Sequence, residues 1–246
     1  MIRLFFPMRR LPHLSLEEFL AHWIDVHAVL NDPFRLIRAY VQYHTLTDDP
    51  TREVLAKARL STLEPYDGIP TAWYDSLDDM LTEHDVEKTP YAAPAVEDHK
   101  LFIDDDRSVA CFTEEHPIIE PGGIVPLPYV LVGCIRRNSG IDLPEFQQAW
   151  LNQADYARQA HAQGLIQGLV QNHALTGNAG NIEGIGSREE PWDGIETTYF
   201  RSVAGFKAFA ASAVAQKWSE AEKDFINHEQ SVYVLTRRFV IKGIIR

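Results

Sequence analysis

Histidine, tryptophan and phenylalanine recur at one spacing near the start of the chain. Phe19, Trp23 and His27 are each four residues apart, which places them on one face of a helix. An imidazole in an apolar pocket can act as a general acid or base, because burial and hydrogen bonds move its pKa across neutrality. The pattern makes His27 a candidate catalytic residue. The alternative is a buried, hydrogen-bonded core histidine.

A second polar group follows in a segment of alternating residue types. Tyr40, Gln42 and His44 alternate with Val41 and Tyr43. Side chains at alternate positions of a strand point to the same face. Tyr40, Gln42 and His44 could therefore hold a carbonyl or hydroxyl group and stabilise developing negative charge, with His44 as a second catalytic residue. A packing or sheet-edge role would explain the pattern equally simply.

Aromatic side chains close to these positions could contact a flat, apolar substrate. We predict that Trp23, Tyr40, Tyr43 and Trp73 contribute to substrate binding, together with Gln42. Aromatic residues at such spacings are also typical of a plain hydrophobic core.

The elements that must position these residues occur twice. The repeat pairs 16–23 with 143–150, 40–44 with 169–173, and 102–109 with 225–232. His173 in the second copy corresponds to His44 and is predicted to line the same cavity. The copies differ where Ala154 takes the place of His27, so only the first copy is predicted to be catalytic.

Each copy is predicted to fold as strand, helix, strand, strand, helix, strand, the ferredoxin-like arrangement. In the first copy the expected strands are 2–8, 38–46, 71–74 and 102–112, with helices starting at Leu16 and Ser76. Helices cover one face of such a sheet, so its other face needs a partner. We expect an α+β fold in which two tandem modules press their sheets together into an intramolecular barrel. The barrel interior would hold a small ligand.

The predicted boundaries follow from the repeat and the linker composition. Residues 1–113 form the first module and 129–246 the second, degenerate one. Residues 114–128 contain four prolines and two glycines, which is typical of a linker. The loops 47–65 and 176–191 are expected to flank the cavity mouth.

Composition excludes several classes of function. The chain has 246 residues, 45% of them hydrophobic, and a formal net charge of −12. This charge repels phosphate backbones, so nucleic acid is not an expected partner. No apolar run approaches the roughly 20 residues of a membrane helix, and the apolar start is too short for a signal peptide. We therefore predict a cytoplasmic protein without membrane contact.

Cysteine and histidine spacing gives no metal or disulfide signal. Cys111 and Cys134 lie in apolar runs and are predicted to be buried free thiols. The ten histidines show neither a helical pair with an acidic third ligand nor a His-x-His strand pair, so no metal site is predicted.

The helix motif with Glu, Phe, Trp and His over Leu16 to His27, followed by Tyr-x-Gln-x-His over 40–44, resembles the EthD family of the dimeric α+β barrel superfamily. The second half departs from the motif at Ala154 and Leu169. The resemblance implies two fused ferredoxin-like modules that form their barrel within one chain. Relatives in the superfamily are known as lactone isomerases, polyketide cyclases and dehydratases, cofactor-free oxygenases, haem enzymes and accessory proteins of xenobiotic degradation.

Three functions are compatible with these observations. The first is a cofactor-independent dehydratase, isomerase or related lyase acting on a small hydrophobic lactone, phenol or polyketide-like ring, with His27 as the proton carrier. The second is a haem enzyme whose axial ligand would be His161, His173 or His228. The third is a non-catalytic accessory or ligand-binding protein. Association of two chains into a homodimer is left open.

Overall fold

The computed structural model describes residues 1–56, 58–122, 127–175 and 190–243. Its strands are β1 Ile2–Phe5, β2 Ala39–Thr45, β3 Gly68–Tyr74, β4 Cys111–Ile119, β5 Tyr129–Ile135, β6 Gly168–Ala174, β7 Gly194–Phe200 and β8 Val232–Lys242. They form one closed barrel of antiparallel pairs in the order β1-β3-β2-β8-β5-β7-β6-β4. The predicted α+β barrel is confirmed.

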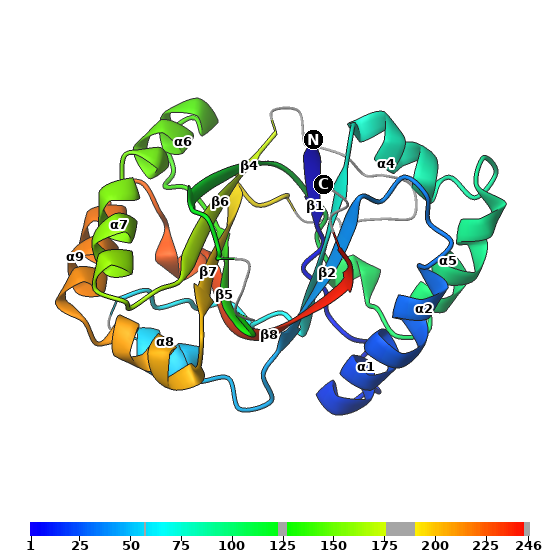
Figure 1. Ribbon diagram of the computed structural model, residues 1–246, viewed down its shortest axis with the longest axis horizontal. Helices are drawn as coiled ribbons and strands as arrows, with labels where there is room; N and C mark the ends of the chain where they lie inside the picture. Colours follow the sequence, from blue (N-terminus) through cyan, green and yellow to red (C-terminus); the bar gives the residue numbers. More distant parts are fainter. Residues whose placement is uncertain (57, 123–126, 176–189, 244–246) are drawn as a thin grey trace.

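Helices pack outside the barrel on two opposite sides (Figure 1). One side carries α1 Leu16–His22, α2 Ala28–Leu30, α4 Leu77–His84 and α5 Ala93–His99; the other carries α6 Leu143–Leu151, α7 Ala154–Ala162, α8 Val203–Ala210 and α9 Ala213–Glu222. The short helix α3 Thr51–Leu55 belongs to the first half of the sequence but contacts α8 and β8 of the second. This contact brings the segment 49–63 against the second half.

The first helix begins where the sequence predicts. The Ser15 hydroxyl accepts a hydrogen bond from the Glu18 backbone N–H, and the Glu18 carboxylate accepts one from the Ser15 backbone N–H. The helix then widens into a π-helical stretch, Trp23–His27, which the periodicity did not predict. Such stretches often occur at functional sites. This one carries the buried side chains of Trp23 and His27.

The strand predicted over 102–112 is wrong. Residues Asp105–Arg107 form a 3₁₀ turn, and the strand β4 begins only at Cys111. It continues to Ile119, so residues 114–119 of the expected linker belong to the sheet. The reason is pairing across the two halves, because β4 pairs with β6 along most of its length. A local pattern cannot reveal a partner that is distant in the sequence.

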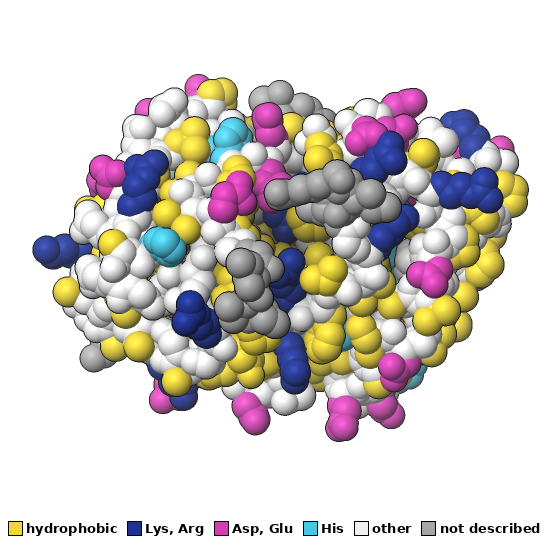
Figure 2. Space-filling view, in the orientation of Figure 1, with side chains coloured by type: hydrophobic (Ala, Val, Ile, Leu, Met, Phe, Trp, Pro, Cys, Tyr) yellow, Lys and Arg dark blue, Asp and Glu magenta, His cyan; other side chains and the backbone are white. Residues whose placement is uncertain are grey.

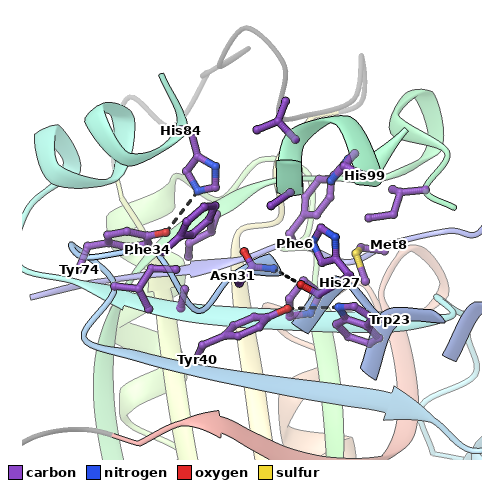
Figure 3. Close-up of a pocket in the computed structure, with 17 residues that line it drawn as sticks. Phe6, Met8, Trp23, His27, Asn31, Phe34, Tyr40, Tyr74, His84 and His99 are labelled. Carbon is purple, nitrogen blue, oxygen red and sulfur yellow. Dashed lines mark hydrogen bonds between the residues drawn. The ribbon is translucent and has the colours of Figure 1, made fainter. Parts of the chain in front are cut away.

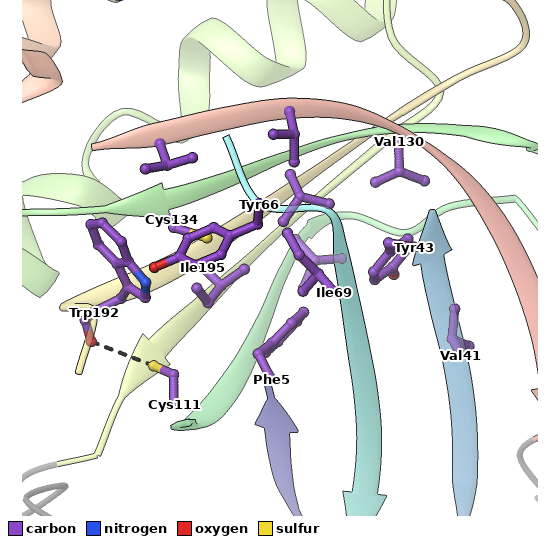
Figure 4. Packing of buried hydrophobic residues seen from close by; sticks show 14 of the residues in the cluster. Phe5, Val41, Tyr43, Tyr66, Ile69, Cys111, Val130, Cys134, Trp192 and Ile195 are labelled. Atoms are coloured by element: carbon purple, nitrogen blue, oxygen red, sulfur yellow. Dashed lines mark hydrogen bonds between the residues drawn. The ribbon is translucent and has the colours of Figure 1, made fainter. Parts of the chain in front are cut away.

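The interior of the barrel is packed with side chains in the described part of the chain (Figure 4). All eight strands contribute, and large groups such as Phe5, Tyr43 and Trp73 face inward. An eight-stranded barrel is only wide enough for its own side chains or one small ligand. The predicted ligand cavity between the two sheets is therefore corrected: the pocket lies outside the barrel, under the helices of the first half.

Other sequence expectations concern the surface and the cysteines. Cys111 and Cys134 are free and buried, as predicted, and burial raises the pKa of Cys111 to about 12. Every helix within the described ranges is too short or too polar to span a membrane. On the face shown in Figure 2, basic side chains are dispersed among acidic ones. The residues 176–189 of one predicted mouth loop lie outside the described residues.

Candidate active site

A pocket lies between the outer face of β1, β2 and β3 and the helices that cover them (Figure 3). Its volume is about 100 Å³. Ten of the residues that line it are apolar: Leu4, Phe6, Met8, Phe34, Ile37, Pro70, Ala72, Ala95, Val96 and Ile103. The others are Trp23, His27, Asn31, Tyr40, Tyr74, His84 and His99. The pocket is therefore a largely apolar space with a few polar groups, as expected of a small-molecule site.

His27 is held in the pocket by a buried carboxylate. Its Nδ1 lies 2.8 Å from Asp98 Oδ2, and Asp98 Oδ1 lies 2.9 Å from His22 Nε2. Because a carboxylate only accepts hydrogen bonds, Nδ1 carries the proton and Nε2 keeps its lone pair. Burial lowers the pKa of His27 to about 4, against the raising effect of the Asp98 hydrogen bond. At neutral pH His27 is thus an uncharged imidazole that can accept a proton at Nε2.

The Tyr40 hydroxyl is arranged as a hydrogen-bond donor. It accepts one hydrogen bond from Trp23 Nε1 and another from Gln42 Nε2, each over 3.2 Å. Its own proton therefore remains available to a third group. Burial raises the pKa of Tyr40 to about 12, so the hydroxyl stays protonated at neutral pH. Tyr40 can donate to an oxygen atom of a molecule in the pocket.

Gln42 and His44 lie behind this layer and are not among the residues that line the pocket. His44 Nε2 is 2.8 Å from Gln42 Oε1, and its ring stacks on Trp23 with centroids 4.6 Å apart. Gln42 Nε2 also donates to the Trp23 carbonyl oxygen over 3.3 Å. These contacts fix the tryptophan at the point where the helix becomes π-helical.

The second half repeats this arrangement without a histidine at the position of His27. Gln171 Nε2 donates to the Trp150 carbonyl oxygen over 2.9 Å, His173 Nε2 lies 3.1 Å from Gln171 Oε1, and the His173 ring stacks on Trp150 at 5.1 Å. Ala154 and Leu169 stand there in place of His27 and Tyr40. The Gln and His residues are present although His27 and Tyr40 have no counterpart there, which indicates that they position the tryptophan. His173 consequently lies on the other side of the barrel from the pocket.

Two more predicted binding residues face the barrel interior instead. The Tyr43 hydroxyl accepts a hydrogen bond from Arg3 Nη2 over 3.2 Å, and Trp73 Nε1 donates to Glu115 Oε2 over 3.2 Å. The alternation of β2 is as predicted, with Tyr40 on the helix side and Tyr43 on the inner side. Of the predicted set, the structure brings Trp23, His27 and Tyr40 together at the pocket.

Several pocket residues were not predicted from the sequence. Asp98 and His99 close α5, and His84 closes α4. His84 Nε2 lies 3.3 Å from the Tyr74 hydroxyl, and His99 Nε2 lies 2.5 Å from Asp105 Oδ1. Asp105, in the 3₁₀ turn Asp105–Arg107, thus contacts His99. A possible signal was the Asp98-His99 pair at the end of a predicted helical region.

The corresponding space in the second half is filled. The rings of Phe206 and Phe209 pack on Phe200 at 5.6 Å and 5.7 Å. The guanidinium of Arg59, from the segment 49–63 of the first half, enters beside them and lies 5.5 Å from the Trp218 ring. The two halves have therefore diverged: the first carries a pocket, and in the second aromatic rings and an arginine pack together.

Arg59 is paired with two buried carboxylates. Its Nη2 lies 2.9 Å from Glu222 Oε1 and its Nη1 3.4 Å from Glu196 Oε1. All three side chains are at most 4% exposed. Burial raises the pKa of Glu222 to about 8, although Arg59 acts in the opposite direction. The arginine is thus the cation that neutralises this buried acidic pair.

The predicted haem ligands do not meet at the pocket. His161 is exposed on α7, His173 stacks on Trp150, and His228 Nδ1 lies 2.8 Å from the Tyr233 hydroxyl. None of the three histidines lines the pocket of the first half. The ligand set expected for haem therefore does not fit this pocket. Within the described ranges, no group of three His, Cys, Asp or Glu side chains is placed to hold a metal ion.

Five buried histidines make the fold sensitive to acid. Burial lowers the pKa of His27, His44 and His84 to about 4 and that of His173 and His228 to about 3. In the unfolded chain these groups titrate near pH ~6.5, so between about pH 6.5 and 4 the unfolded state binds more protons. We expect these histidines not to reduce the free energy of unfolding above this pH window. Within it, the free energy of unfolding should fall steadily as the pH drops. Urea unfolding at several pH values measures this, and equal stabilities at about pH 7 and pH 5 would contradict it.

The comparisons with known proteins agree with this architecture. An anthrone oxidase-like protein matches with a TM-score of 0.60 and 8% identity, covering 99% of this chain and 94% of its own. A candidate monooxygenase from Fusobacterium nucleatum matches with a TM-score of 0.56 and 6% identity over 98% and 92% of the two chains. A chlorite dismutase variant from Candidatus Nitrospira defluvii in complex with cyanide matches with a TM-score of 0.52 and 10% identity, covering 98% of this chain and 91% of its own. At these identities the likeness shows the fold alone.

Sequence comparison assigns the first half. No curated protein sequence matches the chain significantly. The family model of the EthD domain matches residues 11–106, the part of the chain that contains His27, Tyr40 and Asp98. Residues 11–106 are therefore similar to the EthD domain, and the described strands of the chain close into an eight-stranded antiparallel barrel.

Proposed function

We propose that the chain is a cofactor-independent acid–base enzyme for a small hydrophobic, oxygenated ring compound such as a lactone, a phenol or a polyketide-like ring. The reaction would be a dehydration, an isomerisation or a related lyase step. One observation carries the proposal: the uncharged His27, fixed by Asp98 with its Nε2 free, shares an apolar pocket with a Tyr40 hydroxyl whose proton is unused.

The roles of the residues follow from their hydrogen bonds. His27 Nε2 removes a proton from the carbon next to a carbonyl group, and Asp98 stabilises the imidazolium that forms. The Tyr40 hydroxyl donates to the substrate oxygen, on which negative charge develops. His27 then returns the proton to another atom of the substrate or to the leaving group. In this proposal His44 has a positioning role through Gln42 and Trp23, in place of the catalytic role predicted from the sequence.

We further propose that the chain consists of two tandem ferredoxin-like modules, 1–119 and 129–246. The first ends later than the predicted residue 113 because β4 continues to Ile119, which shortens the connection to 120–128. Each half has its four strands in the same relative order. The pairs Arg10–Asp67 and Arg137–Asp193 also correspond. The second module would be the non-catalytic partner that completes the barrel. Because the barrel closes within one chain, a homodimer is not needed to form it and stays a prediction.

Proton transfer can be tested before the natural substrate is known. The purified protein is mixed in deuterium oxide with cyclic ketones, lactones and phenolic ketones, and exchange of the acidic C–H is followed by NMR. The proposal expects exchange with at least one ring class, above the rate in buffer and above that with heat-denatured protein. Absence of exchange throughout, with a Soret band after haem addition, would overturn it in favour of a haem protein.

Asp98→Asn tests how His27 is held. The amide can donate to Nδ1 and so favour the tautomer with a proton on Nε2, which cannot act as the base. We expect the exchange rate to fall on the order of 10- to 100-fold. Nitrogen NMR of the imidazole would show the change of tautomer. Asp105→Asn is the matched control, because its carboxylate binds His99, and it should affect the rate far less. A similar loss in both variants would assign Asp98 a merely structural role.

A further inference from the structure

The charge and the layout of the pocket indicate which ligand it would bind. This inference rests on the proposed function of the same site. We propose that the substrate is electrically neutral and carries an oxygen function at each of two opposite ends of an apolar ring. This excludes rings with a carboxylate or an ammonium group and favours hydroxylated ring ketones and similar compounds.

The first observation is the charge of the lining. None of the 17 residues that line the pocket is Lys, Arg, Asp or Glu. Two buried carboxylates next to lining residues in the sequence are engaged elsewhere: Asp98 binds His27 and His22, and Glu83 accepts hydrogen bonds from the Arg35 backbone and the Tyr91 hydroxyl. An ion that entered would lose its water without meeting an opposite charge, which is costly. The lining thus selects uncharged molecules.

The second observation is that polar groups occur at two ends. His27 and the Tyr40 hydroxyl lie at one side, and Tyr74 with His84 lies at the other (Figure 3). The Tyr74 hydroxyl and His84 Nε2 are 3.3 Å apart, so this pair offers both a donor and an acceptor. Burial lowers the pKa of His84 to about 4, which keeps this end uncharged as well. A ligand with one oxygen would leave the remaining hydrogen-bonding capacity of one of these ends unused.

The third observation is the apolar part of the lining, which faces the pocket together with the amide of Asn31. Phe6, Phe34, Ile37 and Ala72 contribute to it, and the Phe34 ring packs edge-on against His84 at 5.9 Å. Aromatic and aliphatic walls of this kind suit a ring. The ring would therefore span the pocket with one oxygen near Tyr40 and His27 and the other near Tyr74.

Binding of three matched probes tests the proposal. They are 4-hydroxyacetophenone, which is neutral with two oxygen functions, acetophenone, which lacks one, and 4-hydroxybenzoate, which is an anion. Titration calorimetry at about pH 6 keeps the phenol protonated. We expect 4-hydroxyacetophenone to bind about tenfold more tightly than acetophenone and at least about tenfold more tightly than 4-hydroxybenzoate.

A variant at the Tyr74 end of the pocket distinguishes the binding contributions of the two ligand oxygens. Tyr74→Phe should weaken binding of 4-hydroxyacetophenone to the level of acetophenone and leave acetophenone unchanged. Tyr156→Phe, on α7 of the other half, is the control and should alter neither affinity.

The outcomes separate this inference from the proposed function. If 4-hydroxybenzoate binds as tightly as 4-hydroxyacetophenone, or if no probe binds, the inference is overturned even where C–H exchange is observed. If the neutral probes bind in the expected order but no ring compound exchanges, the inference stands and the acid–base function fails.

Discussion

Replacing His27 by glutamine is expected to slow C–H exchange by about 10²- to 10⁴-fold, the usual contribution of a general base. Glutamine is similar in length and can still donate to Asp98 through its amide, so the fold and the pocket should be kept. It has no lone pair of comparable basicity to place where Nε2 lies. The measurement is the exchange rate at saturating ligand, with the thermal unfolding midpoint recorded for both proteins.

The matched control is His22→Gln. His22 binds the same carboxylate, Asp98, but from the outer side of the helix, where its side chain is 30% exposed. The exchange rate of this variant should stay within a few-fold of the wild type. If His27→Gln also retained the rate within a few-fold, His27 would not be the base.

The pH dependence gives an independent check on His27. A base must be unprotonated to act, and its pKa is lowered to about 4 in the folded protein. We expect kcat/KM to be level from neutral pH downward and to fall only as the pH approaches 4, because protonation of Nε2 then removes the base. An acid limb near pH ~6.5 would mean that His27 is solvated or is not the group observed.

The second large effect is on stability and concerns Arg59. Replacing it by alanine leaves Glu196 and Glu222 buried without a cation, and removing one member of a buried ion pair commonly costs about 3–5 kcal/mol. We expect Arg59→Ala to lower the free energy of unfolding by about this amount, measured by urea unfolding at neutral pH. The pocket of the first half does not contact Arg59, so ligand affinity per folded molecule should change little.

Two further variants test the electrostatic reason. Arg52→Ala removes an exposed arginine of the same segment, whose Nη2 donates to the Leu63 carbonyl oxygen, and should cost less than about 1 kcal/mol. Adding Glu196→Gln to Arg59→Ala should recover part of the loss, since the carboxylate that is left without its cation is then removed. Burial already raises the pKa of Glu222 to about 8, so Glu222→Gln should recover less. Equal, small losses in Arg52→Ala and Arg59→Ala would show that the buried ion pairs contribute little.

The repeat, the barrel and the faces of β2 could be predicted because they depend on local spacing. Alternation alone separates Tyr40 from Tyr43, and Ser15 with Glu18 marks the start of a helix. The side on which the ligand space lies could not be predicted, since both faces of each sheet are apolar. The inner face proved to be filled by Tyr43 and Trp73.

The candidate site was predicted in part for a similar reason. Trp23, His27 and Tyr40 belong to one short motif, so the sequence places them together. Asp98 lies 71 positions beyond His27 and meets it only through the packing of α5 on the first helix. Neither periodicity nor composition encodes such a contact, and the π-helical stretch that presents His27 has no simple sequence signal.

The final strand of each half pairs with its own half on one side and with the other half on the other: β4 lies between β1 and β6, and β8 lies between β5 and β2. Each half thus pairs both edge strands of its sheet with strands of the other half. If one half unfolded, the edge strands of the other half would lose their hydrogen-bonding partners. The two halves should therefore unfold together in one cooperative transition. A fragment that contains only one half would expose two unpaired edge strands and would tend to aggregate.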